Sequence, residues 1–252
     1  MIRFLGTGTS TGVPQLGCDC EVCRSRDVRD NRLRSSLMIR SGDLKLLIDC
    51  SPDFRQQMFE IPFKRIDGIL FTHEHYDHVG GIDELRPYSK FGTVELYMEE
   101  RLEMAIRTRL PYCFGENKYK GVPDLHINRI EADKSFKIGH LEILPIRVMH
   151  YMLPILGFRI GDFAYLTDVK TIDEHSYEKL KGVDTLVINA LRRTEHISHL
   201  TLDQAIEVSK RIGARETYFT HISHEMGMHA DVEKILPDGI HLAYDGLELP
   251  IL

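Results

Sequence analysis

Short apolar runs separated by polar or glycine-rich turns recur along the whole chain. In the first half they cover residues 2–5, 36–40, 44–49, 67–72 and 94–98. In the second half they cover residues 125–130, 135–138, 141–148, 155–160, 163–167, 185–189, 216–220, 240–243 and 247–251. Runs of four to eight apolar residues bounded by turn signals are typical of buried strands. We therefore expect a strand-rich chain, with a hairpin around Ser41-Gly42-Asp43.

Helical patterns lie between these runs. We expect helices over residues 82–88, 99–108 and 173–180, and one that begins at Ser51-Pro52 with Ser51 as its cap. Thr201 to Gln204 has the form of a capping box and opens a further helix that ends before Gly213. Residues 110–124 contain two prolines and two glycines, which predicts a long loop where substrate specificity could reside.

Composition narrows the class of protein. A chain of 252 residues with 42% hydrophobic content can form one large α/β domain, and we expect a single domain over residues 1–252. The net charge of −6, from 32 basic and 38 acidic residues, argues against a surface that coats nucleic acid. The first residues lack a signal-peptide pattern and no apolar run reaches 18 residues, so we expect a cytoplasmic protein with no membrane partner.

The strongest chemical signal is His73-Glu74-His75-Tyr76-Asp77-His78, directly after the apolar run Ile69-Leu70-Phe71. Imidazole and carboxylate ligands suit zinc, manganese or iron, whereas calcium prefers oxygen alone. His73 and His75 are two residues apart and point the same way in extended backbone, so they could bind one ion. Asp77 and His78 follow the turn and could bind a second.

Three further candidate ligands each follow a predicted strand: His150, Asp168 and His221. A lone histidine or aspartate at the end of a strand is usually a hydrogen-bonded or exposed residue that binds no metal. Several strand ends of one sheet open onto one edge, however, so these three could meet the cluster at 73–78.

Cysteines form a second cluster, Cys18-Asp19-Cys20-Glu21-Val22-Cys23, which holds three of the five in the chain. In a reducing compartment this spacing indicates metal binding rather than disulfides. Cys50 and Cys113 are isolated, and we expect both to be small buried residues. The run from Arg24 to Arg34 carries five arginines; a solvated surface is the usual role, and contact with an anionic substrate is the alternative.

The arrangement of His73, His75, Asp77 and His78 with the three later ligands resembles the metallo-β-lactamase superfamily, over nearly the whole chain. The resemblance implies a four-layered αββα sandwich of the α/β class. It implies one metal ion held by His73, His75 and His150, a second held by Asp77, His78 and His221, and Asp168 bridging the two.

A subfamily match rests on Leu5-Gly6-Thr7-Gly8, Gly12-Val13-Pro14, the cysteine cluster and Thr220-His221-Ile222-Ser223-His224. These motifs are similar to those of phosphodiesterases that act on phosphoribosyl cyclic phosphates. That resemblance implies a structural zinc bound by Cys18, Cys20, Cys23 and His224. A three-cysteine, one-histidine set suits a closed tetrahedral zinc site.

The resemblance also implies that His199 assists the leaving group, with Asp77 as the other catalytic residue. His196 is the local competitor of His199, and spacing alone does not separate them. We expect no site role for five other histidines: His126, His140, His175, His229 and His241. Two zinc or manganese ions in such a site would lower the pKa of a shared water, and the hydroxide would attack a phosphodiester.

The expected substrate is accordingly a small cyclic-phosphate or phosphodiester metabolite, and a homodimer is conceivable. The alternatives are a transfer-RNA 3′-processing endonuclease and a non-catalytic accessory protein of cofactor biosynthesis, both with similar metal-binding motifs. The acidic balance and the cysteine cluster argue against the nuclease, and the complete set of seven candidate ligands favours an enzyme.

Overall fold

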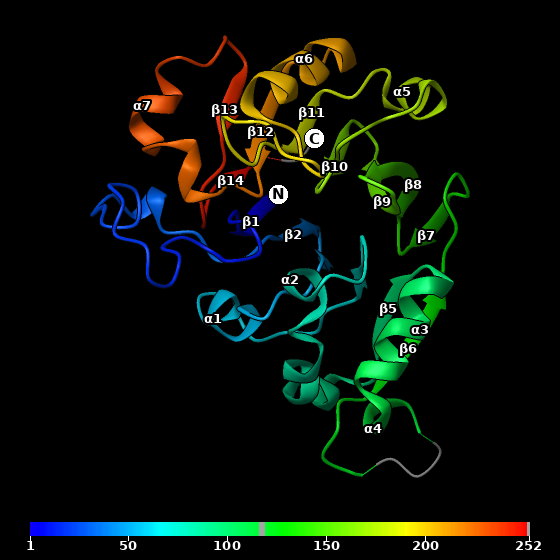
Figure 1. Ribbon diagram of the computed structural model, residues 1–252. Helices are drawn as coiled ribbons and strands as arrows, with labels where there is room; N and C mark the ends of the chain where they lie inside the picture. The colour runs from blue at the N-terminus through cyan, green and yellow to red at the C-terminus, as the bar shows by residue number, and fades with distance from the viewer. Residues whose placement is uncertain (116–118, 251–252) are drawn as a thin grey trace.

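A computed structural model of the chain describes residues 1–115 and 119–250. Two seven-stranded sheets lie face to face, and helices cover the outer side of each (Figure 1). The strand order is β14-β1-β2-β3-β4-β5-β6 in the first sheet and β13-β12-β11-β10-β9-β8-β7 in the second. The chain therefore builds one sheet and then the other, and its last strand returns to the first sheet.

The first sheet and its surroundings come mainly from the amino-terminal half. Its strands are β1 (Ile2–Gly6), β2 (Ser36–Ser41), β3 (Leu44–Ile48), β4 (Gly68–Leu70), β5 (Val94–Met98), β6 (Leu125–Arg129) and β14 (Glu248–Leu249). The helical segments of this half are the 3₁₀ helix η1 (Val28–Asp30), α1 (Phe54–Met58), α2 (Tyr76–Val79), the 3₁₀ helix η2 (Ile82–Phe91), α3 (Glu100–Arg109) and α4 (Pro111–Phe114).

The second sheet comes from the carboxyl-terminal half. Its strands are β7 (Phe136–Ile138), β8 (Leu141–His150), β9 (Leu153–Ile160), β10 (Phe163–Leu166), β11 (Thr185–Asn189), β12 (Glu216–Thr220) and β13 (Ile240–Leu242). The helices are α5 (Glu174–Leu180), α6 (Leu202–Ile212), the 3₁₀ helix η3 (His224–Met226) and α7 (His229–Glu233).

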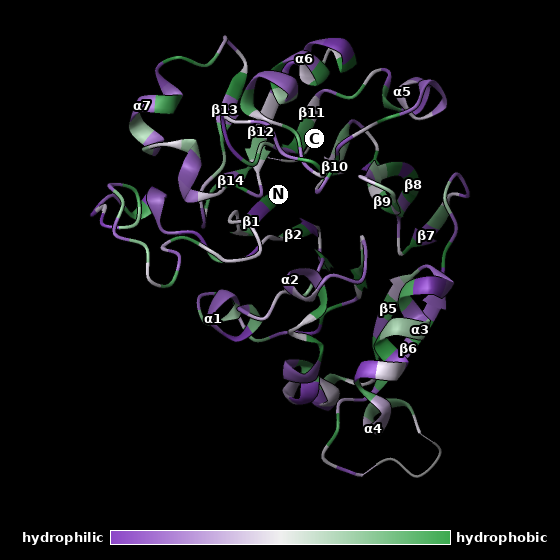
Figure 2. Ribbon diagram, in the orientation of Figure 1, coloured by the Kyte–Doolittle hydropathy of each residue, from purple (hydrophilic) through white to green (hydrophobic). Residues whose placement is uncertain are grey.

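Alternation along the strands creates the layers. In β3, Leu47 joins the core between the first sheet and its helices, whereas Leu46 and Ile48 join the core between the two sheets. In β11, Ile188 faces the helices of the second sheet and Val187 faces the first sheet. Successive side chains on a strand point to opposite faces, so an uninterrupted apolar run supplies both cores at once. Figure 2 shows the resulting hydrophobic colour along strands such as β8 and β13 and the hydrophilic colour on α5.

The four-layered αββα sandwich is thus confirmed, as are the hairpin between β2 and β3 and the capping box of Thr201 and Gln204. The helix α6 ends at Gly213, whose φ of 77° is the left-handed conformation that glycine adopts readily. Within the described residues, no helix combines the length and the apolar character needed to cross a membrane.

Two local predictions were wrong. Ser51 does not cap α1; the cap position is Asp53, and the Ser51 hydroxyl instead accepts a hydrogen bond from the Asp53 amide. Residues 110–124 are not one loop, because α4 forms there and buries Cys113 against the first core. Residues 116–118 of that predicted loop lie outside the described residues.

Candidate metal centre

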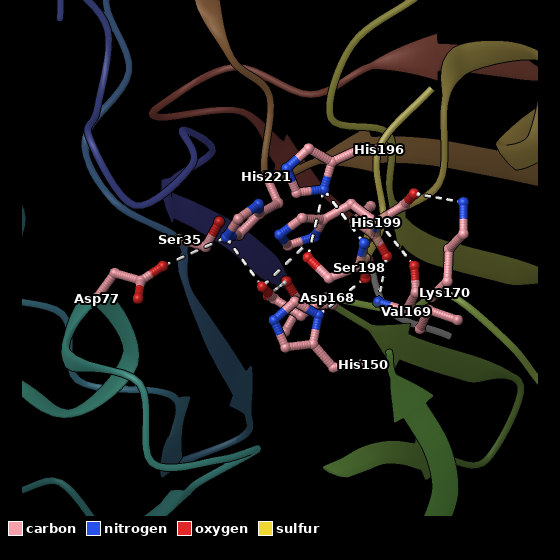
Figure 3. A network of polar contacts seen from close by, with 12 residues as sticks. Ser35, Asp77, His150, Asp168, Val169, Lys170, His196, Ser198, His199 and His221 are labelled. Atoms are coloured by element: carbon pink, nitrogen blue, oxygen red, sulfur yellow. Dashed lines mark hydrogen bonds and ion pairs between the residues drawn. The ribbon is translucent and has the colours of Figure 1, made fainter. Parts of the chain in front are cut away.

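The predicted ligands gather where strands of both sheets end. In the second sheet, β10, β11 and β12 are parallel, so their carboxyl ends share one edge; Asp168 and His221 follow two of them. In the first sheet, β3, β4 and β5 are parallel, and the segment after β4 leads into α2 with Asp77 and His78. Figure 3 shows Asp77, His150, Asp168 and His221 directed toward a common centre.

Four groups of residues in this centre have ligand atoms within 4.8 Å of one another: His73 with His75 and His150, His73 with His78 and Asp168, Asp77 with His78 and His221, and His150 with Asp168 and His199. The first and third correspond to the two ion sites that the sequence resemblance implies. Asp168 is grouped with His73 and His150 of the first site and with His78 of the other. One of its oxygens is 3.2 Å from Nε2 of His78 and the other is 3.2 Å from Nε2 of His221.

The unused nitrogen atoms show that this centre suits metal ions. Nε2 of His73 is buried and forms no hydrogen bond within the described residues, and Nε2 of His78 faces the carboxylates of Asp77 and Asp168 at 3.2 Å each. The opposite ring nitrogens are engaged: Nδ1 of His73 is 2.9 Å from the Thr72 hydroxyl, and Nδ1 of His78 is 2.7 Å from Asp49. Leaving a buried polar atom unsatisfied costs about 1–3 kcal/mol, and a metal ion would satisfy Nε2 of His73. Histidines with an oriented outer nitrogen and a free inner one are typical metal ligands.

Electrostatics favour cations at the same point. Burial holds the pKa of His73 well below its usual value, so the ring is neutral, which is the form that binds metal. Burial also acts to lower the pKa of His78, but the carboxylates of Asp77, Asp168 and Asp49 outweigh it and raise that pKa well above normal. Three carboxylates around one buried imidazole create a negative potential that a divalent ion would neutralise.

Two aspartates and one histidine of the centre have a left-handed backbone conformation. Asp49, Asp168 and His221 have φ angles of 63°, 57° and 56°, in the left-handed region that is uncommon for residues other than glycine. Each comes directly or almost directly after a strand: β3, β10 and β12, respectively. Such conformations cluster at functional sites, because the fold holds a side chain where its own backbone preference would not.

Asp49 is the site residue that the sequence interpretation missed. It is fully buried, accepts hydrogen bonds from the amide and hydroxyl of Thr72, and contacts Nδ1 of His78. It therefore orients His78, and through Thr72 it also supports His73. A signal existed in the sequence, because Asp49 ends an apolar run as Asp168 does.

We expect Asp49→Asn to lower metal affinity or hydrolytic activity by about 10- to 100-fold, the usual effect of losing a carboxylate that orients a ligand histidine. Titration of the metal-free protein with zinc or manganese would measure it. Asp43→Asn is the matched control. It removes the same charge as Asp49→Asn, but from an exposed residue in the turn before β3. Equal affinities of the two variants would contradict this role of Asp49.

His199 lies in the centre, whereas His196 lies at its margin. Nδ1 of His199 is buried without a hydrogen bond in the described structure, 3.7 Å from Asp168, and its ring is 4.8 Å from that of His221. The His196 ring centroid is 5.1 Å from that of His199, and Nδ1 of His196 accepts a hydrogen bond from the Ser198 amide. Burial lowers the pKa of His199 to about 3. This geometry supports the choice of His199 over His196.

The second predicted metal group also assembles. Cys18, Cys20, Cys23 and His224 lie within 4.8 Å of one another, with the Cys18 and Cys20 sulfurs 3.5 Å and 3.4 Å from Nδ1 of His224. The Cys23 amide donates to the Cys20 sulfur, and this hydrogen bond is the main cause that lowers the pKa of Cys20 to about 6. Thiolate character of this kind is what zinc requires.

The arginine run from Arg24 to Arg34 has mainly structural contacts. Arg32 is buried and donates to the Thr7 hydroxyl, Arg29 pairs with Asp27, and Arg34 pairs with Asp53. These contacts favour a structural role for the three side chains over contact with an anionic substrate. The five histidines without an expected role are in none of the metal-capable groups found among the described residues.

Comparison with known proteins agrees with the fold. The sequence pattern described as "Beta-lactamase superfamily domain" matches residues 45–222, so the chain belongs to the metallo-β-lactamase superfamily. The crystal structure of "a New Diphosphatase from the PhnP Family" is 38% identical, covers 100% of this chain and 97% of that one, and superposes with a TM-score of 0.93. Within the superfamily, the chain is thus a member of the PhnP family.

Two other similarities concern a longer relative and a solved structure. A protein of Porphyromonas gingivalis named "Octanoyltransferase" is 47% identical over 247 residues, which are 97% of this chain but 50% of that protein. The chain thus spans about half the length of this curated relative. Zinc-bound PqqB of Methylobacterium extorquens is 20% identical, covers 99% of each chain and has a TM-score of 0.81, which shows a shared fold.

Proposed function

We propose that the chain is a metal-dependent hydrolase that acts as a phosphodiesterase on small phosphorylated metabolites. The position of Asp168 is the observation that carries this proposal. Its two oxygens face His78 and His221 at 3.2 Å each, while His73 and His150 complete groups on its other sides. A carboxylate shared by two ion sites suits in-line displacement at phosphorus, where both the attacking and the leaving oxygen carry charge.

In this proposal one zinc or manganese ion would be held by His73, His75 and His150 and a second by Asp77, His78 and His221, with Asp168 as a ligand available to both. Cys18, Cys20, Cys23 and His224 hold a separate structural zinc. Bound at the Asp168 centre, the two ions would supply a nucleophile at neutral pH and Lewis-acid stabilisation of the phosphate. Thr72 and Asp49 hold Nδ1 of His73 and Nδ1 of His78, which leaves the Nε2 atoms of both rings directed to the centre.

His199 would assist the leaving group. Its low pKa makes the ring neutral near pH 7, so it presents one N–H and one lone pair to the centre. A negatively charged phosphate against the ring would raise that pKa, because an adjacent opposite charge favours the protonated form. His199 then donates to the departing oxygen, a role that typically contributes about 10²- to 10⁴-fold.

The relatives support the reaction class and leave the substrate to experiment. The PhnP-family relative is described as a diphosphatase, a name that also denotes hydrolysis at phosphorus. The octanoyltransferase is about twice as long as this chain, so we do not assign octanoyl transfer to the shared half. The nuclease alternative is disfavoured by the net charge of −6, and the accessory-protein alternative by the complete ligand set.

A substrate panel tests the proposed function. Protein loaded with zinc or with manganese is expected to hydrolyse bis(p-nitrophenyl) phosphate and small ribose cyclic phosphates, and to lose both activities on chelation and regain them on reloading. Efficient cleavage of precursor transfer RNA without turnover of the small substrates would replace the proposal with the nuclease. No turnover by a fully metal-loaded protein would favour the accessory role.

A further inference from the structure

Three neighbouring parallel strands of the second sheet end at the metal centre: β10, β11 and β12. β10 leads into Asp168 and β12 into His221, and β11, which lies between them, ends at Asn189. Asn189 is 0% exposed and follows the apolar residues Leu186 to Ile188 of the same strand. Burying a carboxamide costs free energy unless its polar atoms are bonded. The partners of Asn189 therefore indicate its role.

Asn189 bonds to the residue that follows Asp168. Its Oδ1 accepts a hydrogen bond from the Val169 amide at 2.6 Å, and its Nδ2 donates to the Val169 carbonyl at 3.1 Å. Val169 is 0% exposed and lies beyond the last ladder pair of β10 and β11, Leu166 with Ile188. One carboxamide thus satisfies both backbone groups of a buried residue, as a neighbouring strand would.

The position of Val169 matters because Asp168 has a left-handed backbone. Its φ angle of 57° costs free energy relative to the extended region, even for an aspartate. Such a residue keeps its conformation only when the structure on both sides holds it. β10 does so on the amino-terminal side, and Asn189 does so on the carboxyl side. If this hold were lost, the chain would relax and turn the carboxylate away from His78 and His221.

Val169 and Lys170 also connect Asp168 with His199. The carbonyl of Val169 accepts a second hydrogen bond from the Leu200 amide at 3.1 Å. Nζ of Lys170 lies 3.3 Å from the carbonyl of His199 (Figure 3). These two contacts hold both polar groups of the peptide bond between His199 and Leu200. A shift of Val169 would therefore also shift the imidazole that is proposed to assist the leaving group.

The same segment is connected with His150. The Lys170 amide donates to the carbonyl of Met149, directly before His150, at 2.8 Å. Asp168, His150 and His199 form one of the groups whose ligand atoms lie within 4.8 Å of one another. The backbones of all three residues thus meet at residues 169 and 170, and Asn189 fixes the first of these two.

We propose that Asn189 is a positioning residue of the metal centre: by bonding to both backbone groups of Val169, it keeps the Asp168 carboxylate directed at the two ion sites. The inference rests on the Asp168 centre of the proposed function. It adds to that centre a residue whose own side chain bonds to none of the candidate ligands among residues 1–115 and 119–250. Because Asn189 acts through geometry, its loss is expected to lower kcat and metal affinity and to leave KM almost unchanged.

Cobalt(II) in place of the two catalytic ions reports this geometry without relying on hydrolysis. Mild chelation is expected to strip the Asp168 centre while the cysteine group retains its zinc, and cobalt is then added. The absence of a thiolate-to-cobalt charge-transfer band verifies that cobalt has not entered the cysteine group. The visible absorption bands then report the ligand geometry at the Asp168 centre, and their growth during the titration gives the affinity.

Two neutral substitutions remove the contacts to Val169 without changing the charge of the centre. Asn189→Leu has a similar volume and lacks both polar atoms, whereas the short hydroxyl of Asn189→Ser cannot reach both backbone groups. Each variant is expected to bind cobalt about 10- to 100-fold more weakly, with shifted visible bands. Each is also expected to lower kcat for bis(p-nitrophenyl) phosphate by about 10- to 100-fold, with little change in KM.

Ser209→Ala is the matched control. Ser209 is 3% exposed on α6, which packs against β11, and its hydroxyl donates to the Ala205 carbonyl within the helix. The variant removes a buried hydrogen bond that does not involve residues 168–170. It is expected to lower the melting temperature slightly and to keep the cobalt spectrum, the cobalt affinity and the kcat of the wild type.

The outcomes separate a positioning role from a merely structural one. If the Asn189 variants melt at a lower temperature but keep the cobalt bands, the affinity and the kcat of the wild type, the inference is overturned. If Asn189→Leu does not fold, the same measurements on Asn189→Ser decide. A wild-type protein that binds cobalt at the Asp168 centre but hydrolyses no phosphodiester would refute the proposed function, and the cobalt measurements would still decide the role of Asn189.

Discussion

Replacing Asp168 is expected to reduce hydrolysis of bis(p-nitrophenyl) phosphate by about a thousandfold or more. Asp168 is 1% exposed and is the residue whose oxygens face both His78 and His221. Removing a ligand shared by two ions removes several kcal/mol of transition-state stabilisation, and each 1.36 kcal/mol corresponds to a factor of about ten in rate. The loss is expected in kcat, since the metal centre acts on charge that develops in the transition state.

Two substitutions keep this experiment interpretable. Asp168→Ala removes the side chain but places alanine at a φ of 57°, whereas Asp168→Asn keeps a residue that tolerates the left-handed conformation. Both should retain the circular dichroism spectrum of the wild type and bind fewer ions at the catalytic centre. Asp162→Ala, which alters an exposed aspartate just before β10, is the control and should retain full activity. Unchanged turnover of either Asp168 variant would remove Asp168 from its proposed place between the ions.

Cys20→Ser is expected to lower the melting temperature by roughly 4–8 °C and to reduce the metal content from about three ions per chain to two. A closed thiolate site contributes its binding free energy to folding, and about 2 kcal/mol corresponds to several degrees in a chain of this size. The same site should hold its zinc under mild chelation that strips the other two ions. Thermal melts and elemental analysis before and after chelation would measure both effects.

The position of the cysteine site explains why stability and activity should change together. The segment from His221 to His224 contributes to both metal-capable sites. His221 belongs to the Asp168 centre, and His224 belongs to the cysteine group. Between these ligands, Ile222 exchanges backbone hydrogen bonds with the glycine-rich loop: its amide donates to Thr7, and its carbonyl accepts from Thr9. Loss of the zinc would free this loop and, through Ile222, disturb His221, so activity should fall moderately.

Asp19→Ser is the matched control for Cys20→Ser, because Asp19 is the exposed neighbour and pairs only with the exposed Arg24 among the described residues. It should change neither the melting temperature nor the zinc content. A Cys20→Ser protein that melts with the wild type and still contains about three ions would refute the structural zinc site.

Much of the centre could be predicted from the sequence because its signals are local. The six residues His73 to His78 directly follow a buried apolar run, and Asp168 and His221 also stand at strand ends. The strands were recognisable because they are buried on both faces and therefore appear as continuous apolar runs. Once those strands were recognised, the common edge of parallel strands made convergence of the ligands a natural expectation.

Other features escaped because their role depends on a distant partner. Asp49 looks like any acidic residue after a strand until its contact with His78, 29 positions later, is seen. The arginines at 24–34 looked like a surface, yet Arg32 is buried against Thr7 and the last part of the chain.

The sequence by itself determined the order of strands and helices, the apolar faces that build the layers, and the residue types able to bind metal. These depend on short-range backbone preferences and on the alternation of side chains along a strand. Tertiary packing alone decided which nitrogen of each imidazole points inward, that Asp49 orients His78, and that Asn189 bonds to Val169. Such relations are distances between residues far apart in the chain, and the packing of the two sheets sets them.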